Sequence, residues 1–136
     1  MANFRLNVDK AVFDTLNVAG VVNVATGGVF NTMARRDVSP PYVIFQAMSK
    51  VDEHSFNGRF GNAVYMVKAV SRSPWPKEAE DVDTQVDTVM EDASLSITGY
   101  TRLLCRREQD FYLVEDQGGE RWQHVGGLYR IIADQV

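Results

Sequence analysis

The chain has 136 residues, of which 45% are hydrophobic and 24% charged, enough for one domain that buries roughly two-thirds of the surface of its unfolded chain. Its net charge of -4 comes from 14 Lys and Arg against 18 Asp and Glu, which excludes a broad basic surface for nucleic acid. The single cysteine, Cys105, excludes an internal disulfide and no apolar run spans a membrane, so we expect one domain over residues 1–136, made in a reducing compartment without export.

The first twenty residues have a helical periodicity, which predicts a helix from Asn7 to Ala19. Asn7 is a suitable N-cap and Gly20 a suitable stop. The stretch Val21–Phe30 is apolar but interrupted by a glycine pair, which predicts a loop that leads into a short strand near Val29. The apolar positions that set the helical spacing are Val8, Val12, Leu16 and Ala19, with Phe13 beside them.

The segment Tyr42–Ser71 is predicted to form one long β-hairpin that turns at Asn57-Gly58. Two prolines, Pro40 and Pro41, remove backbone donors just before it, as is common where an edge or exposed strand begins. Arms of this length would extend roughly 40 to 50 Å at about 3.3 Å per residue, whereas typical strands have about 5 to 6 residues. We therefore expect the outer part to stand away from the body and to contact another molecule.

Both alternating sets of side chains at the base of this hairpin are largely apolar. One face is expected to take the helices, and the other needs a cover that a neighbouring subunit would supply. The two sets on the first strand are Val43, Phe45 and Ala47 against Tyr42, Ile44 and Met48.

The sequence Ser73-Pro74-Trp75-Pro76 ends the hairpin and begins a second helix, predicted from Lys77 to Ser94. An acidic row on this helix, Asp83, Asp87 and Glu91, is interpreted as a hydrated face and not as a cation site, because all three carboxylates come from one helix. The apolar stripe that should face the sheet consists of Ala79, Val82, Val86, Val89 and Ala93.

The remaining chain is predicted to be β-structure, with a turn at Gly118-Gly119 and a turn or bulge at Gly126-Gly127. Together, these elements predict an α+β fold: an antiparallel β-sheet with a long protruding β-hairpin and two helices packed on one face. The four predicted strands are Tyr100–Arg107, Asp110–Glu115, Arg121–Val125 and Leu128–Ala133.

No motif for nucleotide, metal or nucleophilic chemistry is present in the sequence, so no catalytic residue, cofactor site or metal site is predicted. The two histidines, His54 and His124, are interpreted as surface or structurally satisfied side chains. Aromatic residues and arginine are enriched at protein interfaces, which makes four residues candidates for an interface with another subunit or a tube: Phe56, Arg59, Phe60 and Trp75.

Several features of the chain are similar to the tail-completion or tail-terminator proteins of long-tailed bacteriophages. These are the N-terminal helix, the Pro-Pro-Tyr-Val-Ile-Phe start of the hairpin, the Trp-Pro break before an acidic helix, and the closing Gly-Gly-Leu-Tyr-Arg-Ile-Ile-Ala strand. The resemblance implies a non-enzymatic subunit of a virion ring, commonly a hexamer, at the head-proximal end of the tail. Its implied partners are other copies of itself, the tail tube protein and the head-neck connector protein, with DNA only passing through the channel.

Two alternatives come from other classes of protein. A cone-shaped α+β isomerase or cyclase would line a cavity with His124, Asp110 and Tyr112. A peptide-binding adaptor would use the exposed edge of the hairpin. A polar cavity in an isolated monomer favours the enzyme, and association into a ring favours the tail protein.

Overall fold

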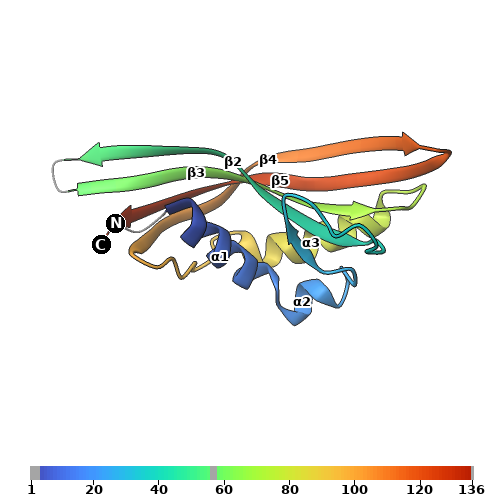
Figure 1. Ribbon diagram of the computed structural model, residues 1–136, viewed down its shortest axis with the longest axis horizontal. Coiled ribbons are helices and arrows are strands. Elements are labelled where there is room, and N and C mark those ends of the chain that lie inside the picture. Colours follow the sequence, from blue (N-terminus) through green and yellow to red (C-terminus); the bar gives the residue numbers. More distant parts are fainter. Residues whose placement is uncertain (1–3, 56–57, 136) are drawn as a thin grey trace.

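The computed structural model describes the backbone of residues 4–55 and 58–135, and the side chains of residues 52–55, 58–59, 102–103 and 135 lie outside the described part. Within these ranges the chain forms an α+β fold in which the helices lie on one face of a single sheet (Figure 1). This confirms the predicted fold class. None of the helices in the described ranges is both long and apolar enough to cross a lipid bilayer.

The sheet has five strands in the order β1-β2-β3-β5-β4. Strand β1 pairs with β2 in parallel, and the other neighbours pair antiparallel, so the sheet is mixed at one edge. In chain order the elements are α1 (Phe4–Leu16), α2 (Ala19–Val22), β1 (Val29–Asn31), β2 (Tyr42–Ser55), β3 (Gly58–Ser71), α3 (Lys77–Met90), β4 (Tyr100–Gln117) and β5 (Glu120–Gln135).

The core lies between the helices and one face of the sheet. Paired residues of an antiparallel sheet share a face, and the pairs Tyr65–Tyr129 and Ala63–Ile131 are fully buried beneath the helices. This arrangement buries the alternate residues that the period-2 pattern predicts. The buried helical residues that complete the core are Val8, Val12 and Leu16 of α1 and Ala79, Val82, Val86 and Met90 of α3.

Helix α1 begins three residues before the predicted start and ends at Leu16. Phe4 is buried, and its ring packs edge-on against Tyr100 at 4.8 Å between centroids, so a long-range contact holds the first turn. Asn7 does not cap the helix, because its amide donates to the Thr98 carbonyl at 3.0 Å. Gly20 does not stop it either, since it lies inside α2, a short helix in the stretch that was predicted to be a loop. The predicted strand near Val29 is present as β1.

The β2–β3 hairpin has the predicted limits, and its last described pair is Ser55 with Gly58. The turn was predicted at Asn57-Gly58, and residues 56–57 lie outside the described part. The register is fixed at the base of the hairpin, where buried Val43 and Phe45 pair with Ala69 and Val67. A bulge between Ala47 and Ser49 then sets which residues remain for the turn.

Most of the predicted arm is the centre of the sheet. Strand β3 pairs with β2 on one side and with β5 on the other from Phe60 to Ser71, so only the end beyond Phe60 projects. The reason is the length of β5, which the prediction had divided into two short strands. A second hairpin, β4–β5, ends at the opposite extreme of the long axis, as Figure 1 shows.

Helix α3 starts at Lys77 as predicted but ends at Met90, four residues before Ser94. Asp92 adopts a left-handed backbone with φ 58°, and its N–H donates to the Cys105 carbonyl at 2.8 Å. The chain then leaves the helix and buries Leu95 and Ile97 against the core. Tertiary contacts therefore end this helix, although residues 91–94 contain neither glycine nor proline.

Strand β4 is continuous through residues 108–109 and strand β5 is continuous through Gly126-Gly127, two positions that were predicted to separate strands. The turn at Gly118-Gly119 is confirmed, with φ values of 60° and 84°. Gly126 and Gly127 form no turn: a Cβ on Gly126 would lie 2.1 Å from the Val67 carbonyl oxygen. These glycines permit the close approach of atoms from the neighbouring strands β3 and β4, and they do not reverse the chain.

Replacing Val86 with Asp should unfold the protein, because Val86 is fully buried between α3 and the sheet. We expect a loss of several kcal/mol in the free energy of unfolding, the cost of burying an unpaired carboxylate. Urea denaturation followed by circular dichroism measures this loss. Thr84→Asp, on the exposed face of the same helix, is the matched control and should cost less than about 0.5 kcal/mol. Equal stability of the two variants would contradict the assignment of the buried face.

Candidate functional site

The structure does not bring Phe60 and Trp75, two of the four predicted interface residues, together. Phe56 and the side chain of Arg59 lie outside the described residues. Phe60 is half-buried and pairs with Glu53 and Asp134 at one end of the sheet. Trp75 lies beyond the other end of β3, between Ser71 and α3, and 71% of it is exposed. Candidate contacts thus lie at both ends of the molecule.

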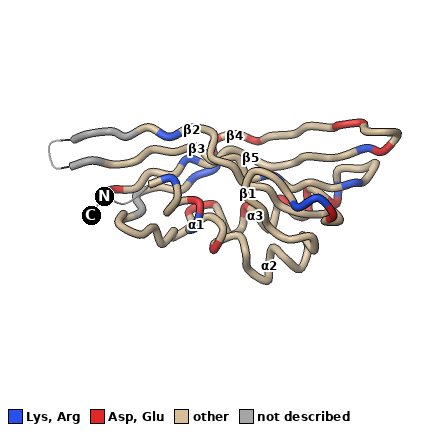
Figure 2. Tube along the Cα trace, viewed as in Figure 1, with Lys and Arg blue, Asp and Glu red and all other residues tan. Residues whose placement is uncertain are grey.

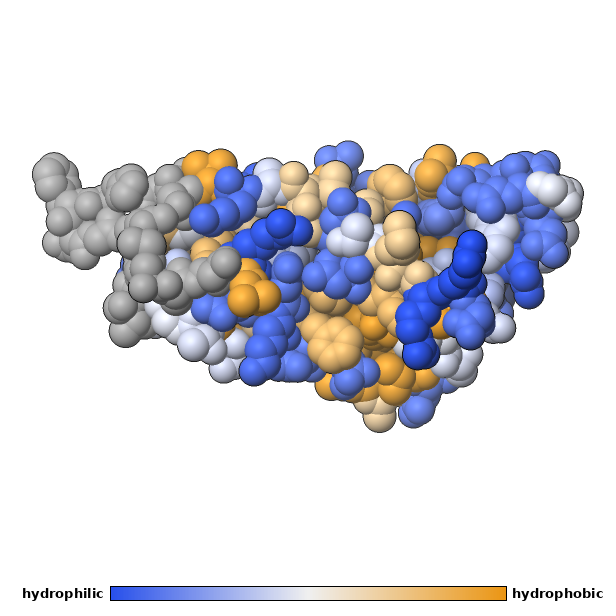
Figure 3. Space-filling model, in the orientation of Figure 1, coloured by the Kyte–Doolittle hydropathy of each residue, from blue (hydrophilic) through white to orange (hydrophobic). Residues whose placement is uncertain are grey.

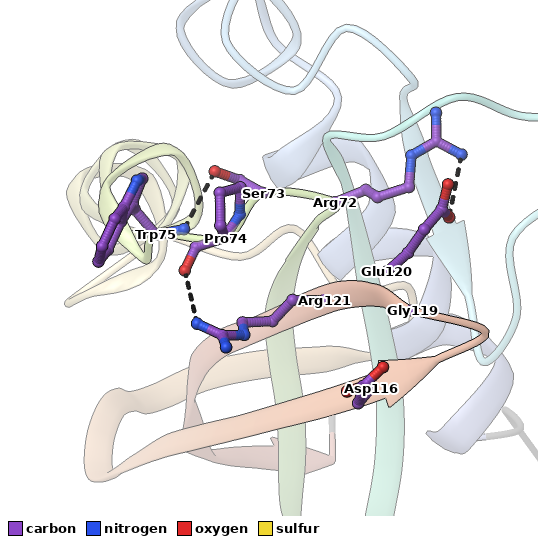
Figure 4. A pocket seen from close by; sticks show the side chains of 8 residues that line it. All are labelled: Arg72, Ser73, Pro74, Trp75, Asp116, Gly119, Glu120 and Arg121. Carbon is purple, nitrogen blue, oxygen red and sulfur yellow. Dashed lines mark hydrogen bonds and ion pairs between the residues drawn. The ribbon is translucent and has the colours of Figure 1, made fainter.

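Trp75 borders a hollow of about 470 Å³ between the β3–α3 connection and the β4–β5 turn (Figure 4). Arg121 reaches from β5 and donates to the Pro74 carbonyl at 3.3 Å, which ties the two sides together. Arg72 of the β3–α3 connection and Glu120 of β5 also form an ion pair across the hollow, at 3.7 Å. The hollow is charged at its walls and has a large aromatic side chain at its rim.

A second hollow of about 550 Å³ lies on another side of Trp75 and is more apolar. Val24 and Val82 line it together with the start of α3. Figure 3 shows apolar side chains gathered over α2 and the adjacent part of α1, and the exposed apolar residues there are Phe13, Val18 and Val24. An exposed tryptophan beside an apolar hollow is the pattern of a protein contact more than of a small-molecule site.

Sequence reasoning missed the distal part of the β4–β5 hairpin. Three consecutive residues there are largely exposed: Tyr112 by 56%, Leu113 by 44% and Val114 by 42%. The signal was present in the run Phe-Tyr-Leu-Val, which is apolar on both faces of a strand and so has no side suited to water. The prediction had placed this run in a short strand, Asp110–Glu115.

Charge is unevenly distributed along the molecule. Figure 2 shows acidic residues near the end of the β4–β5 hairpin, where Glu115, Asp116 and Glu120 outnumber the two nearby bases, Arg121 and Arg72, of which Arg72 pairs with Glu120. This end carries a local negative potential that would select basic or neutral partner surfaces.

The acidic row of α3 is directed at one arginine of β4 and does not form the hydrated face that was predicted. Arg107 makes a bidentate ion pair with Asp83, with both N–O distances 3.0 Å, and lies 3.6 Å from Asp87. The backbone N–H of Arg107 donates to Glu91 at 2.7 Å. Because the guanidinium pairs with Asp83 and Asp87 and the backbone N–H donates to Glu91, these carboxylates serve to dock α3 on the sheet.

Arg107 also spans the glycine pair of β5. Its Nη2 donates to the Gly126 carbonyl at 2.7 Å, and a Cβ on Gly127 would lie 2.5 Å from its Nε. The Tyr129 hydroxyl accepts from Arg107 at 3.2 Å and donates to Asp87 at 2.8 Å. The network joins α3, β4 and β5. Among the described residues, no group of three or more His, Cys, Asp or Glu is placed to hold a metal ion.

Replacing Arg107 with Met should cost about 3 kcal/mol in unfolding free energy, because it leaves Asp83, only 15% exposed at its side chain, without its counter-charge. Chemical denaturation measures the loss. Adding Asp83→Asn should restore part of it, since no unpaired charge then remains. The control is Arg106→Met, at an exposed neighbouring position. A loss at Arg107 no larger than at Arg106 would contradict a docking role.

The three residues of the enzyme alternative do not share a cavity. His124 pairs with Leu113, and Tyr112 pairs with Val125, so adjacent positions put His124 and Tyr112 on opposite faces of the sheet. Asp110 is bound to Arg107 Nε at 2.8 Å. Asp110 and Tyr112 line one hollow of about 460 Å³, but His124 does not, so the geometry gives no support to proton transfer by the three residues together.

His124 is buried on the sheet face away from the helices, where its Nε2 lies 2.5 Å from Glu115 Oε1. Burial lowers the pKa of His124, and Lys68 of β3 lowers it further, while Glu115 of β4 opposes the shift. Burial likewise lowers the pKa of Lys68 and raises the pKa of Tyr42, the first residue of β2. The native state therefore favours neutral His124.

Acidification should destabilise the protein through His124. Because the folded pKa lies below the unfolded value of about 6.5, the unfolded chain binds more protons between the two values. This contribution is present above about pH 6.5 and is lost as pH falls toward the folded pKa. Melting temperatures at pH 7.5 and 5.5 test it: the drop should be smaller in His124→Gln than in the unsubstituted protein. Equal drops would contradict it.

These surfaces define a class of protein: an assembly subunit with exposed apolar residues at separate places and no converging catalytic groups among the residues described. A sequence model of the family described as "Tail completion protein gp17" matches residues 10–132. The chain belongs to this family, and it is a structural protein of a phage-type tail.

Two solved structures have the same fold. A chain of the "Virion of native gene transfer agent (GTA) particle" superposes with a TM-score of 0.83 at 11% identity, covering 98% of this chain and 99% of that one. A second solved chain superposes with a TM-score of 0.61 at 11% identity, covering 97% and 95%. A comparison with curated proteins returned no significant match.

Proposed function

We propose that this chain is one subunit of a ring, with six copies, that caps the head-proximal end of a tail tube. The ring ends growth of the tube and joins the tail to the head-neck connector, without catalysing a reaction. Its partners are other copies of the chain, the tail tube protein and the connector protein, and DNA only passes through. It is located in the virion, after assembly in the host cytoplasm.

The observation that carries this proposal is the position of exposed apolar residues at separate places on an elongated sheet. Trp75 and the run Tyr112 to Val114 lie toward the β4–β5 end, whereas Val51, 55% exposed, lies on the β2–β3 hairpin. A subunit that contacts one partner needs one such surface, but a ring subunit between a tube and a connector needs several. Family membership and the fold shared with a gene transfer agent virion chain support the same role.

Charge is consistent with a DNA channel. The net charge of -4 and the acidic end of the β4–β5 hairpin would weaken adhesion to phosphates. A passage through which DNA moves requires weak contacts more than tight ones.

The direct test is the mass of the native particle across a concentration series by light scattering, followed by electron microscopy. We expect a mass that rises to six copies, 6 × 15.3 kDa or about 92 kDa, together with annular particles. A mass of one copy at all concentrations, with no annular particles when the tail tube protein is added, would contradict the proposal.

Replacing Trp75 with Ala should weaken assembly without changing the fold. Because Trp75 is 71% exposed, the free energy of unfolding should change by less than about 0.5 kcal/mol. An interface anchor such as Trp75 contributes about 2 kcal/mol, so its loss should raise the concentration for half-assembly roughly thirty-fold. The control is Met33→Ala, which removes an apolar side chain that is 76% exposed in another loop. Equal effects in both variants would argue against Trp75 as an anchor.

A further inference from the structure

Strand β4 is the edge of the sheet along all of its 18 residues. Its only strand neighbour in the described part of the chain is β5, so one side of its backbone faces no other strand. Native sheets usually protect such an edge with lysine, proline or a short strand. The stretch from Gln109 to Gln117 contains neither lysine nor proline.

The exposed residues on this edge point to both faces. Leu113 pairs with His124 on the face away from the helices, and Tyr112 and Val114 point to the opposite face. A surface that packs on one face of the sheet would cover only one of these sets. An added strand at the edge would cover both, because its own side chains alternate in the same way.

The same sheet has a second open edge. Strand β1 pairs only with Val43 to Phe45 of β2, so the side of β2 from Gln46 onward is free of a strand in the residues described. Met48 is 54% exposed and Val51 is 55% exposed on this part of β2. Each copy therefore carries two unpaired edges with exposed apolar residues.

The polarity of the two edges is compatible. From β2 to β4 the sheet has three antiparallel steps, so β2 and β4 run in opposite directions. A second copy in the same orientation, placed beside the first, would bring its β2 antiparallel to β4. The charges also match: Gln109–Gln117 has three acids and no base, and Gln46–Val51 has Lys50 and no acid.

We propose that the distal edge of β4, from Phe111 to Val114, pairs with the open edge of β2, from Gln46 to Val51, of a second copy of this chain. The contact is head-to-tail and repeats from copy to copy. This inference rests on the proposed function for its closure into a ring. The two segments are displaced along the sheet, and such a displacement is the shear that closes a sheet into a barrel.

Disulfide trapping tests the pairing directly in the full chain. Cys105→Ser removes the native thiol, and one cysteine is placed on each edge, at Met48 or Val51 and at Leu113 or Val114, to give four double variants. Within one copy the two edges are three strand spacings apart, about 14 Å, beyond the reach of about 7 Å for a disulfide. After oxidation we expect at least one double variant to form covalent ladders beyond the dimer, while each single-cysteine variant stops at a dimer.

A second measurement uses charge on the edge. Leu113→Lys with Val114→Lys should raise the concentration for half-assembly at least ten-fold with unchanged circular dichroism, because both side chains are already part-exposed. The control is Leu6→Lys, at a 63% exposed position of α1.

The outcomes separate this pairing from the ring itself. Rings that persist in the double-lysine variant and give no ladder would overturn the edge pairing and leave the ring in place. Ladders from a protein that forms no ring would support the pairing and overturn the ring. A monomer that forms no ladder overturns both. Ladders only after addition of the tail tube protein, with cross-links to that protein, would overturn the assignment of a second copy.

Discussion

The arrangement of the molecule depends on one part-buried arginine. Arg107 holds α3 to the sheet through Asp83, and it does so across a stretch of β5 that carries no side chains. Glycine at 126 and 127 is what allows the guanidinium to reach the Gly126 carbonyl, so the ion pair and the glycine pair are one structural unit. Tyr129 and Asp110 provide further partners for Arg107, which matters because a partly satisfied charged network costs more than an apolar core.

This unit explains why the helical layer covers only part of the sheet. With α3 fixed at the middle of β4 and β5, the distal β4–β5 hairpin extends past the helices and leaves Tyr112 and Val114 exposed on the helical face, while Leu113 is exposed on the other face. Trp75 lies at the start of the same helix, so docking of α3 also determines where this tryptophan is presented. The core and the candidate contact surfaces are thus positioned by the same set of contacts, and a role in assembly follows from what the fold leaves uncovered.

Several elements were predictable because their signal is local. The strand near Val29, the start of α3 at Lys77 and the turn at Gly118-Gly119 all follow from residues within a few positions of one another. Other features depend on distant partners. Phe4 is helical because Tyr100 packs on it, and the acidic row of α3 contacts Arg107, sixteen residues or more along the chain. No local pattern contains that information.

The sequence by itself determined the α+β class, the two main helices, the long hairpin and the family resemblance, because periodicity and turn chemistry are encoded in neighbouring residues. The tertiary structure alone decided that β3 is central, that β4 is an open edge and that Phe60 and Trp75 lie toward opposite ends of the sheet. Strand order depends on the tertiary structure because pairing joins residues that are far apart in the chain. The competition of all strands for the same core sets which strand remains unpaired.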